Sequence, residues 1–471
     1  MSTDRQGSVS EAVADMVAKA RAAQLAVDEY TQQQADDLAL ASAWAIMQPS
    51  RNRALAELAV HDTGLGNIDD KIIKNHRKTL GLMRDLQGAR SVGIIAEDVE
   101  RGIVEIARPV GVVAAITPST NPGATPANKI INALKCRNAI IVAPSPKGQT
   151  TAALLVGYIH AELQKIGAPT GLVQVLPAPV TREATLALMQ QADLVVATGS
   201  QANVRAAYAS GTPAFGVGAG NVASIIDDDA DVDRAAELIV RSKTFDNATS
   251  CSSENSLVIV GAVYDAMLAA LARRGGALVT IDEKLRLQAT MWPEGKLSPA
   301  VTAQSAGHIA ELAGLERPEL QHSRFLLVEE TGTGRNFPFS GEKLSPVLTV
   351  YRARDFDEAL QRVRAIYAYQ GAGHSVGYHG GDDGHILDLA LDLPVARVIV
   401  NQAHAIATGG SFDNGLPFSL SMGCGTWGRN NFSDNLNYRH FLNITRIARP
   451  IPERVPALAE IFNDYFQRHG E

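Results

Sequence analysis

Residues 110–143 read VGVVAAITPSTNPGATPANKIINALKCRNAIIVA, and this stretch decides the fold class. Apolar runs of the kind that form buried strands occupy Val110–Ile116 and Ala139–Ala143. The segment between them, Pro126–Cys136, has the apolar spacing of a helix. A strand, a helix and a second strand joined by short connections are typical of a parallel sheet that helices cover on both faces.

The alternation continues on the C-terminal side of this stretch. Further helices are predicted over Thr150–Ile166, Thr181–Gln190, Gln201–Ala209 and Asp233–Ser242, and strands over Val173–Leu176, Leu194–Ala197 and Ser224–Ile226. Looser alternation later in the chain predicts strands over Leu257–Val260, Phe325–Glu329, Val347–Tyr351, Ser375–Tyr378 and Val398–Asn401. We therefore predict an α/β protein with a doubly wound, Rossmann-type domain followed by a second α/β domain.

The remaining regions are expected to surround these domains. Residues 8–88 have helical spacing throughout, and we expect a helical layer that carries no chemistry. Residues 92–107 predict a β-hairpin, for which an oligomer contact and a plain pair of edge strands are equally open. The end of the chain predicts a short strand from Phe441 and a helix over Val455–His469.

Composition excludes several classes of function. A net charge of −7 disfavours nucleic acid and anionic membranes as partners. No apolar run is long enough to span a bilayer, and the N-terminus lacks the apolar core of a signal peptide. The three cysteines, Cys136, Cys251 and Cys424, have no paired spacing. We therefore expect a reducing, cytoplasmic location, with neither a disulfide framework nor a zinc cluster, and no metal site elsewhere.

Cys251 is the first candidate for chemistry. It lies in TFDNATSCSSEN, residues 244–255, among small and polar neighbours, between a helical run and an apolar run. A buried structural cysteine is the ordinary alternative, but such cysteines usually have aliphatic neighbours. A thiolate in a bend of this kind is suited to attack a carbonyl carbon.

Other turns after predicted strands carry polar or glycine residues. Asn121 has the amide to donate to an oxyanion, although on local grounds alone a turn role is favoured. Gly199 and Ser200 open a helix and suit a diphosphate, or serve only as a helix cap. The glycine-rich loop 215–221 permits close backbone approach to a ring or a sulfur. Glu342 precedes a strand and could accept from a ribose hydroxyl.

Taken together and in this order, the motifs resemble the aldehyde dehydrogenase superfamily, in particular its CoA-acylating branch. The segments that carry the resemblance are TPSTNP (117–122), KTFDN (243–247), Ser253-Glu254, EKLSPV (342–347) and GCG (423–425). The chain is similar to the acylating half of bifunctional aldehyde–alcohol dehydrogenases and to acylating sulfoacetaldehyde dehydrogenases. This resemblance implies oxidation of an aldehyde with CoA and NADP or NAD, with sulfoacetaldehyde favoured and acetaldehyde or another short aldehyde as the alternative.

The resemblance also implies site residues and domains. Cys251 is the nucleophile, and Asn121 completes the oxyanion hole with the Cys251 backbone N–H. The expected cofactor-binding residues are Thr117, Pro118, Ser145, Lys147, Gly199, Ser200, Gly218 and Glu342. Residues 1–242 are the helical layer and cofactor domain, 243–435 the catalytic domain, and 436–471 a returning or oligomerising tail. A homodimer or homotetramer is expected.

Two departures from the hydrolytic branch bear on the reaction and the cofactor. Hydrolytic relatives carry a general-base Glu where this chain has Val217, so water is poorly activated here and a CoA thiol is favoured. They also carry a ribose-binding Glu where this chain has Pro146, next to Lys147, which favours NADP. Hydrolysis to a free acid is the alternative to acyl transfer. A non-catalytic NADP-binding protein and a reductase of acyl phosphates are more distant alternatives.

Overall fold

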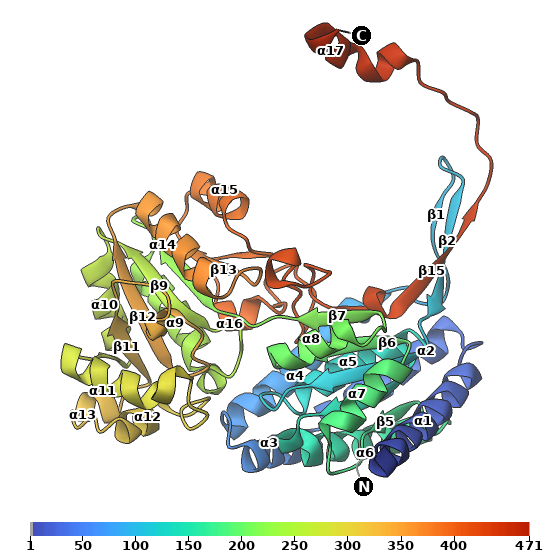
Figure 1. Cartoon of the computed structure of the whole chain (residues 1–471), viewed down its shortest axis with the longest axis horizontal. Helices are drawn as coiled ribbons and strands as arrows, with labels where there is room; N and C mark the ends of the chain where they lie inside the picture. The colour runs from blue at the N-terminus through green and yellow to red at the C-terminus, as the bar shows by residue number, and fades with distance from the viewer. Residues whose placement is uncertain (1–2, 471) are drawn as a thin grey trace.

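Two parallel sheets form the two lobes of the molecule (Figure 1). The computed structural model describes the backbone of residues 3–470 and the side chains of residues 9–470. One lobe has five strands in the order β5-β4-β3-β6-β7, and the other has seven in the order β10-β11-β12-β9-β8-β13-β14. Every strand pair within these two sheets is parallel, which for the five-stranded sheet confirms the prediction.

The five-stranded lobe follows the predicted alternation closely. Its elements are β3 (Val112–Thr117), α5 (Ala124–Lys135), β4 (Ala139–Pro144), η1 (Pro146–Gly148), α6 (Gln149–Lys165), β5 (Val173–Val175), α7 (Arg182–Gln191), β6 (Leu194–Thr198), α8 (Gln201–Ala209) and β7 (Ala214–Val217). Both β3 and β4 are buried along their whole length, which explains their continuous apolar runs. The sheet order reverses between β3 and β6, and ligands bind parallel sheets at such a switch point.

The N-terminal helices are α1 (Thr3–Ala26), α2 (Gln32–Met47), α3 (Pro49–Thr63) and α4 (Ile68–Leu86). They pack against the five-stranded lobe, with α1 against α7 and α2 against α5 and α6. The expectation that this layer carries no chemistry stays a prediction, and α4 also contacts the turn before Cys251. Within the described residues, no helix is long and apolar enough to cross a membrane.

The seven-stranded lobe begins earlier in the chain than expected. β8 lies between β9 and β13 in this sheet, although the sequence grouped it with the first domain. The elements are β8 (Val222–Ile226), α9 (Val232–Thr244), η2 (Phe245–Ala248), β9 (Glu254–Val260), α10 (Tyr264–Arg273), β10 (Gly276–Leu278), α11 (Ile281–Met291), η3 (Pro293–Gly295), α12 (Ala306–Leu312), α13 (Pro318–Gln321), β11 (Phe325–Glu329), η4 (Pro338–Ser340), β12 (Val347–Ala353), α14 (Phe356–Tyr369), β13 (Val376–His379), α15 (Asp383–Asp392), β14 (Val398–Val400), α16 (His404–Ala407) and η5 (Thr426–Gly428).

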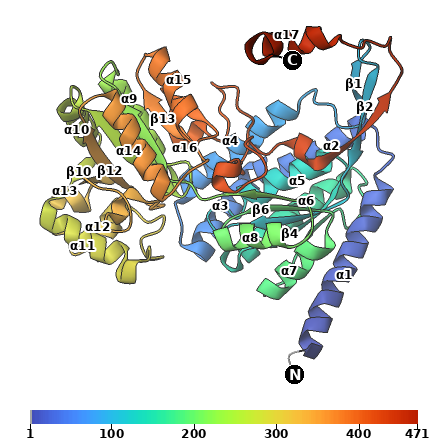
Figure 2. The ribbon, with the colours of Figure 1, turned by 45° about the horizontal axis from the view of Figure 1, so that its top comes forward.

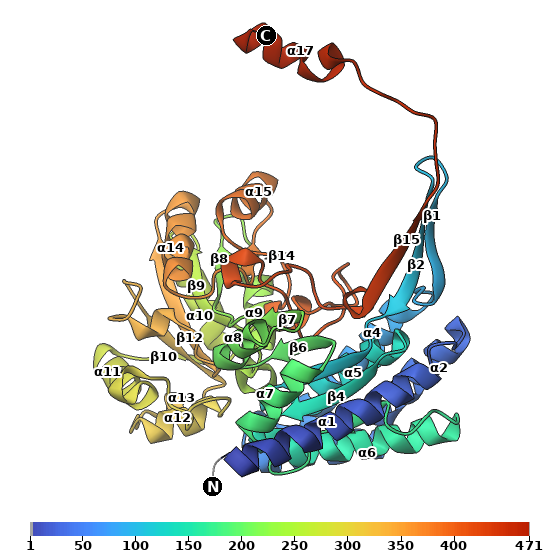
Figure 3. The ribbon, with the colours of Figure 1, turned by 45° about the vertical axis from the view of Figure 1, so that its right-hand side comes forward.

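A third, antiparallel sheet projects from the five-stranded lobe. It joins the hairpin β1 (Gly93–Asp98) and β2 (Ile103–Pro109) to β15 (Leu442–Ala448), which follows η6 (Tyr438–Phe441). Beyond it, an extended segment leads to α17 (Leu458–His469), which stands apart from both lobes in Figures 2 and 3. No residue of α17 is buried.

Candidate active site

A cavity of about 540 Å³ lies where the carboxyl ends of β3 and β6 face the second lobe. The predicted site residues that line it are Thr117, Pro118, Asn121, Ser145, Gly199, Ser200, Gly218, Cys251 and Glu342. Lys147 is the exception: it is exposed on η1, outside this lining. Segments more than 200 residues apart in the sequence therefore meet at one cavity.

The turn that carries Cys251 is held by a buried ion cluster. The three residues Asp246, Asn247 and Ala248 have φ values of 51°, 51° and 56°, a region that non-glycine residues rarely adopt. The fully buried Asp246 carboxylate accepts hydrogen bonds from Lys71 Nζ at 3.1 Å and Lys74 Nζ at 2.5 Å. These lysines come from α4, so that helix stabilises the unusual backbone next to the thiol.

The Cys251 thiol lies beside a neutral imidazole. Its Sγ is 3.5 Å from Nε2 of His374, a buried residue just before β13. Burial, with a smaller effect of Glu342, raises the pKa of the thiol to about 12. Burial and then Arg397 lower the pKa of His374 to about 3. The free enzyme therefore holds a thiol that needs a base, and an uncharged base in contact with it.

The contact of the second ring nitrogen of His374 bears on which tautomer the imidazole adopts. Nδ1 lies 2.7 Å from Ser375 Oγ. In the tautomer that donates from Nδ1 to this hydroxyl, Nε2 is free to take the thiol proton. None of the sequence motifs predicts a role for this residue. His374 is 123 positions from Cys251, and no local signal joins the two.

Asn121 is oriented by a lysine. Lys74 Nζ donates to Asn121 Oδ1 over 2.9 Å. A lysine can only donate, so the oxygen of this amide is identified and its Nδ2 is left as a donor. The Cys251 backbone N–H donates to no acceptor within the described residues. Both groups are therefore available as donors, and the oxyanion hole stays a prediction.

The glycine-rich segment approaches Cys251 closely. Its first part belongs to β7 rather than to the predicted loop. A Cβ on Gly220 would lie 2.0 Å from the Cys251 carbonyl oxygen, so only glycine fits. Val217 also lines the cavity, and Glu342 is the one carboxylate among the described lining residues. Burial raises the pKa of Glu342 to about 8.

The floor of the cavity suits a dinucleotide. The buried hydroxyls of Thr117 and Ser145 have no hydrogen-bond partner in the described part of the chain. Ser200 caps α8 by accepting from the Asn203 backbone N–H, so the first turn of this helix faces the cavity beside Gly199. Unpaired hydroxyls and a helix N-terminus are the groups that bind phosphate and ribose oxygens.

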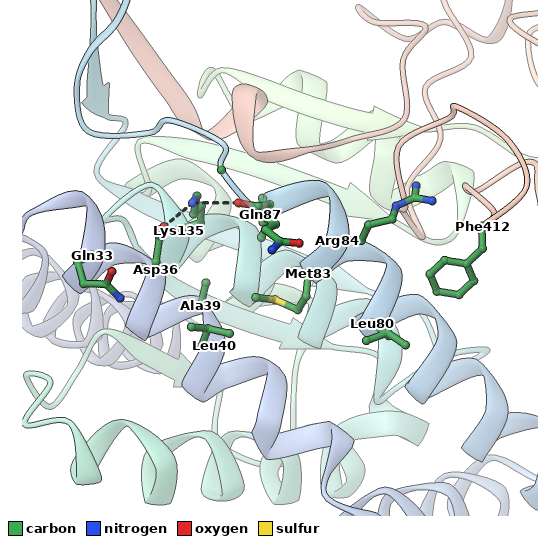
Figure 4. Close-up of a pocket in the computed structure, with 12 residues that line it drawn as sticks. Gln33, Asp36, Ala39, Leu40, Leu80, Met83, Arg84, Gln87, Lys135 and Phe412 are labelled. Carbon is green, nitrogen blue, oxygen red and sulfur yellow. Dashed lines mark hydrogen bonds and ion pairs between the residues drawn. The ribbon is translucent and has the colours of Figure 1, made fainter.

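Other pockets are distinct from this one. Arg205 and Arg429 line a separate surface pocket, whereas Arg241 lines a cavity that adjoins the thiol. A further groove lies on α2 and α4, with Arg84 and Phe412 at one end and Lys135 paired to Asp36 at the other (Figure 4). No cysteine or histidine is among the described residues that line this groove, so it is not a second thiol site.

A thiol beside an imidazole, with two hydrogen-bond donors and a cavity suited to a dinucleotide nearby, is the set of groups that an oxidoreductase acting on aldehydes through cysteine needs. Residues 3–315 match the aldehyde dehydrogenase family, and the chain belongs to that family. It is 68% identical over 462 residues to the acylating sulfoacetaldehyde dehydrogenase of Cupriavidus necator, covering 98% of this chain and 94% of that protein.

Two further relatives agree. The acylating sulfoacetaldehyde dehydrogenase of Bilophila wadsworthia is 42% identical over 464 residues, with 98% of this chain and 99% of that protein covered. The crystal structure of an acetylating aldehyde dehydrogenase from Geobacillus thermoglucosidasius has a TM-score of 0.91 at 35% identity, with 96% and 99% covered. The predicted acylating branch and fold are therefore confirmed.

Proposed function

We propose that this protein converts sulfoacetaldehyde, CoA and NAD(P)⁺ to sulfoacetyl-CoA, NAD(P)H and a proton. The observation that carries the acylating reaction is the scarcity of carboxylates around Cys251. Glu342 alone is present among the described lining residues, and Val217 stands where hydrolytic relatives have their base. Water needs such a base to attack a thioester, whereas a thiol ionises much nearer neutrality. The similarity to acylating sulfoacetaldehyde dehydrogenases supports the choice of aldehyde.

The residues divide the reaction between them. Cys251 attacks the aldehyde carbon while its proton passes to His374 Nε2. Asn121 Nδ2 and the Cys251 N–H hold the oxygen that becomes negative. The nicotinamide cofactor supplies the acceptor for the hydride that leaves the same carbon. Cys251 then carries the acyl group as a thioester. The CoA thiol loses its proton, which is the proton released in the overall reaction, and its sulfur bonds to the acyl carbon. The bond from that carbon to the Cys251 sulfur breaks, and this sulfur recovers a proton from His374.

We propose Thr117, Pro118, Ser145, Gly199, Ser200, Gly218 and Glu342 as the cofactor-binding residues. Lys147 is exposed two residues after Ser145, which lines this cavity, and Lys147 forms no ion pair with any described residue. A free cation there favours the 2′-phosphate of NADP. We expect Lys147→Ala to lower kcat/KM for NADP⁺ more than for NAD⁺. Equal effects on both cofactors would remove this support for NADP.

We also propose that the enzyme acts as a homo-oligomer in a reducing compartment, the cytoplasm. The three cysteines are free, which supports the compartment.

Five apolar side chains of the tail are 44–78% exposed: Val455, Leu458, Ile461, Phe462 and Tyr465. An amphipathic helix held away from its own lobes is stabilised when a partner covers it, and a second copy is the partner we propose. Truncation after residue 448 should lower the mass seen by light scattering, and a full-length monomer would refute the oligomer.

Product analysis tests the proposed reaction. Purified protein is incubated with sulfoacetaldehyde, CoA and each nicotinamide cofactor, and mass spectrometry identifies the product. Sulfoacetyl-CoA is expected. Acetaldehyde is tested in parallel, and a higher kcat/KM for acetaldehyde would replace the proposed substrate. Free sulfoacetate as the first product would mean that water, rather than CoA, releases the acyl group.

A further inference from the structure

A second cavity, of about 260 Å³, adjoins the thiol cavity. Asn121, Ser250 and Leu420 line both, so the second cavity begins at the oxyanion hole and at the neighbour of the nucleophile. Its charged lining residues are Asp70 and four basic side chains, Lys74, Arg77, Lys78 and Arg241. A small cavity with this excess of basic groups is suited to an anion.

The two lysines are already engaged by the protein. Lys74 Nζ donates to Asp246 and to Asn121. Lys78 Nζ donates to the backbone carbonyl of Gly409 over 2.7 Å and to that of the next residue. Burial lowers the pKa of Lys78 to about 7. These lysines therefore line the cavity but have few hydrogen-bond donors left for a ligand.

The two arginines keep unused donors. Arg77 donates from Nη2 to Ser411 Oγ over 2.5 Å, and its guanidinium lies 5.0 Å from the centre of the Phe412 ring. These contacts fix its plane, while its buried Nε has no partner in the part of the chain that is described. Arg241, in the last turn of α9, forms no hydrogen bond or ion pair with any described side chain. Arginines whose donors are unused are the usual ligands of oxyanions.

The nearby carboxylates do not neutralise these arginines directly. Asp413 is exposed and accepts a hydrogen bond from the Ser411 hydroxyl. Asp70 accepts from Asn67 Nδ2 and from the Asp246 backbone N–H. Neither carboxylate forms a salt bridge with an arginine of this cavity, across the residues whose side chains are described. The cavity therefore keeps a positive field.

We propose that Arg77 and Arg241 bind the sulfonate of the substrate and set the preference for an anionic aldehyde over a neutral one. The inference rests on the proposed function. In sulfoacetaldehyde the sulfur is two bonds from the carbonyl carbon, so the anion site must adjoin the oxyanion hole directly. This cavity does so through Asn121 and Ser250. A planar guanidinium can donate to two sulfonate oxygens at once.

The test compares two aldehydes, of which only one carries a sulfonate. Propanal carries a methyl group where sulfoacetaldehyde carries the sulfonate. Arg77→Gln and Arg241→Gln should each lower kcat/KM for sulfoacetaldehyde by about 10- to 100-fold, mainly through KM, because a charged hydrogen bond is lost. Rates with propanal should be almost unchanged. Arg84→Gln is the matched control: Arg84 is on the same helix and also lies over the Phe412 ring, but it lines the other groove (Figure 4).

Ethanesulfonate separates this inference from the proposed function. It should inhibit propanal oxidation by the native enzyme in competition with the aldehyde, and the inhibition should weaken in Arg77→Gln and Arg241→Gln but not in Arg84→Gln. No inhibition, or equal inhibition of all four enzymes, would overturn the anion site. If ethanesulfonate inhibits the enzyme in this way but the enzyme does not oxidise sulfoacetaldehyde, the anion site would be supported and the proposed substrate would be wrong.

Discussion

Asn121 offers a quantitative test of the oxyanion hole. The proposed hole has two donors, the Asn121 amide and the Cys251 backbone N–H, and Lys74 fixes the amide with its nitrogen free. Removal of one such side-chain donor costs about 2.7–4 kcal/mol of transition-state stabilisation, which is about 100- to 1,000-fold in kcat. We expect a loss of this size for Asn121→Ala. Asn121→Asp should lose more, because it keeps the Lys74 contact but presents a carboxylate oxygen to the developing oxyanion.

The assay is the rate of NAD(P)H formation with aldehyde and CoA. Alkylation of Cys251 by iodoacetamide and the thermal midpoint serve as controls for an intact site. An Asn121→Ala enzyme with unchanged kcat and normal alkylation would refute the oxyanion role. An Asp variant more active than the Ala variant would contradict the orientation that the Lys74 contact assigns to the amide.

Three further substitutions probe the thiol and its support. Cys251→Ala should abolish turnover while cofactor binding, measured by calorimetry, is retained; residual turnover at the native rate would exclude this nucleophile. His374→Gln should lower kcat by about 100-fold or more. It should also shift the pH at which the rate rises upward, toward the thiol pKa of about 12. An unchanged pH profile would assign the proton to another group. Asp246→Asn should lower stability by about 3–5 kcal/mol in urea unfolding, because Lys71 and Lys74 lose their buried counter-ion. Burial alone would raise the pKa of Asp246, but Lys74 and Lys71 outweigh it and lower the pKa. Its stabilisation is therefore complete at neutral pH and is lost only as the pH falls below about 4; an unfolding midpoint equal to that of the native enzyme would contradict the cluster.

The five-stranded lobe could be predicted because its signals are local. Strands buried on both faces, such as β3 and β4, read as continuous apolar runs, and each is bounded by a turn. The membership of β8 could not be predicted in this way. A buried strand has the same pattern in either sheet, and only its pairing with β9 and β13 decides which sheet it joins.

The site residues also differ in whether their local sequence predicts them. Asn121, Gly199 and Ser200 follow strands of a doubly wound sheet, so their position at the switch point follows from the strand pattern. His374 and Lys74 reach the site through contacts between residues 123 and 47 positions apart, and nothing in their local sequence marks them. Arg77 lies on a helix that the sequence interpreted as a covering layer, and only the packing of α4 places it at a cavity.

Dependence on CoA is the most direct test of the central claim. Purified enzyme is mixed with sulfoacetaldehyde and NADP⁺ or NAD⁺, and the absorbance of the reduced cofactor is followed with and without CoA. The thiol cavity, with Val217 in place of a base and Glu342 as its one described carboxylate, predicts at most one turnover per site without CoA and sustained turnover with it. Equal sustained rates without CoA would mean that water completes the cycle, and would contradict the acylating mechanism.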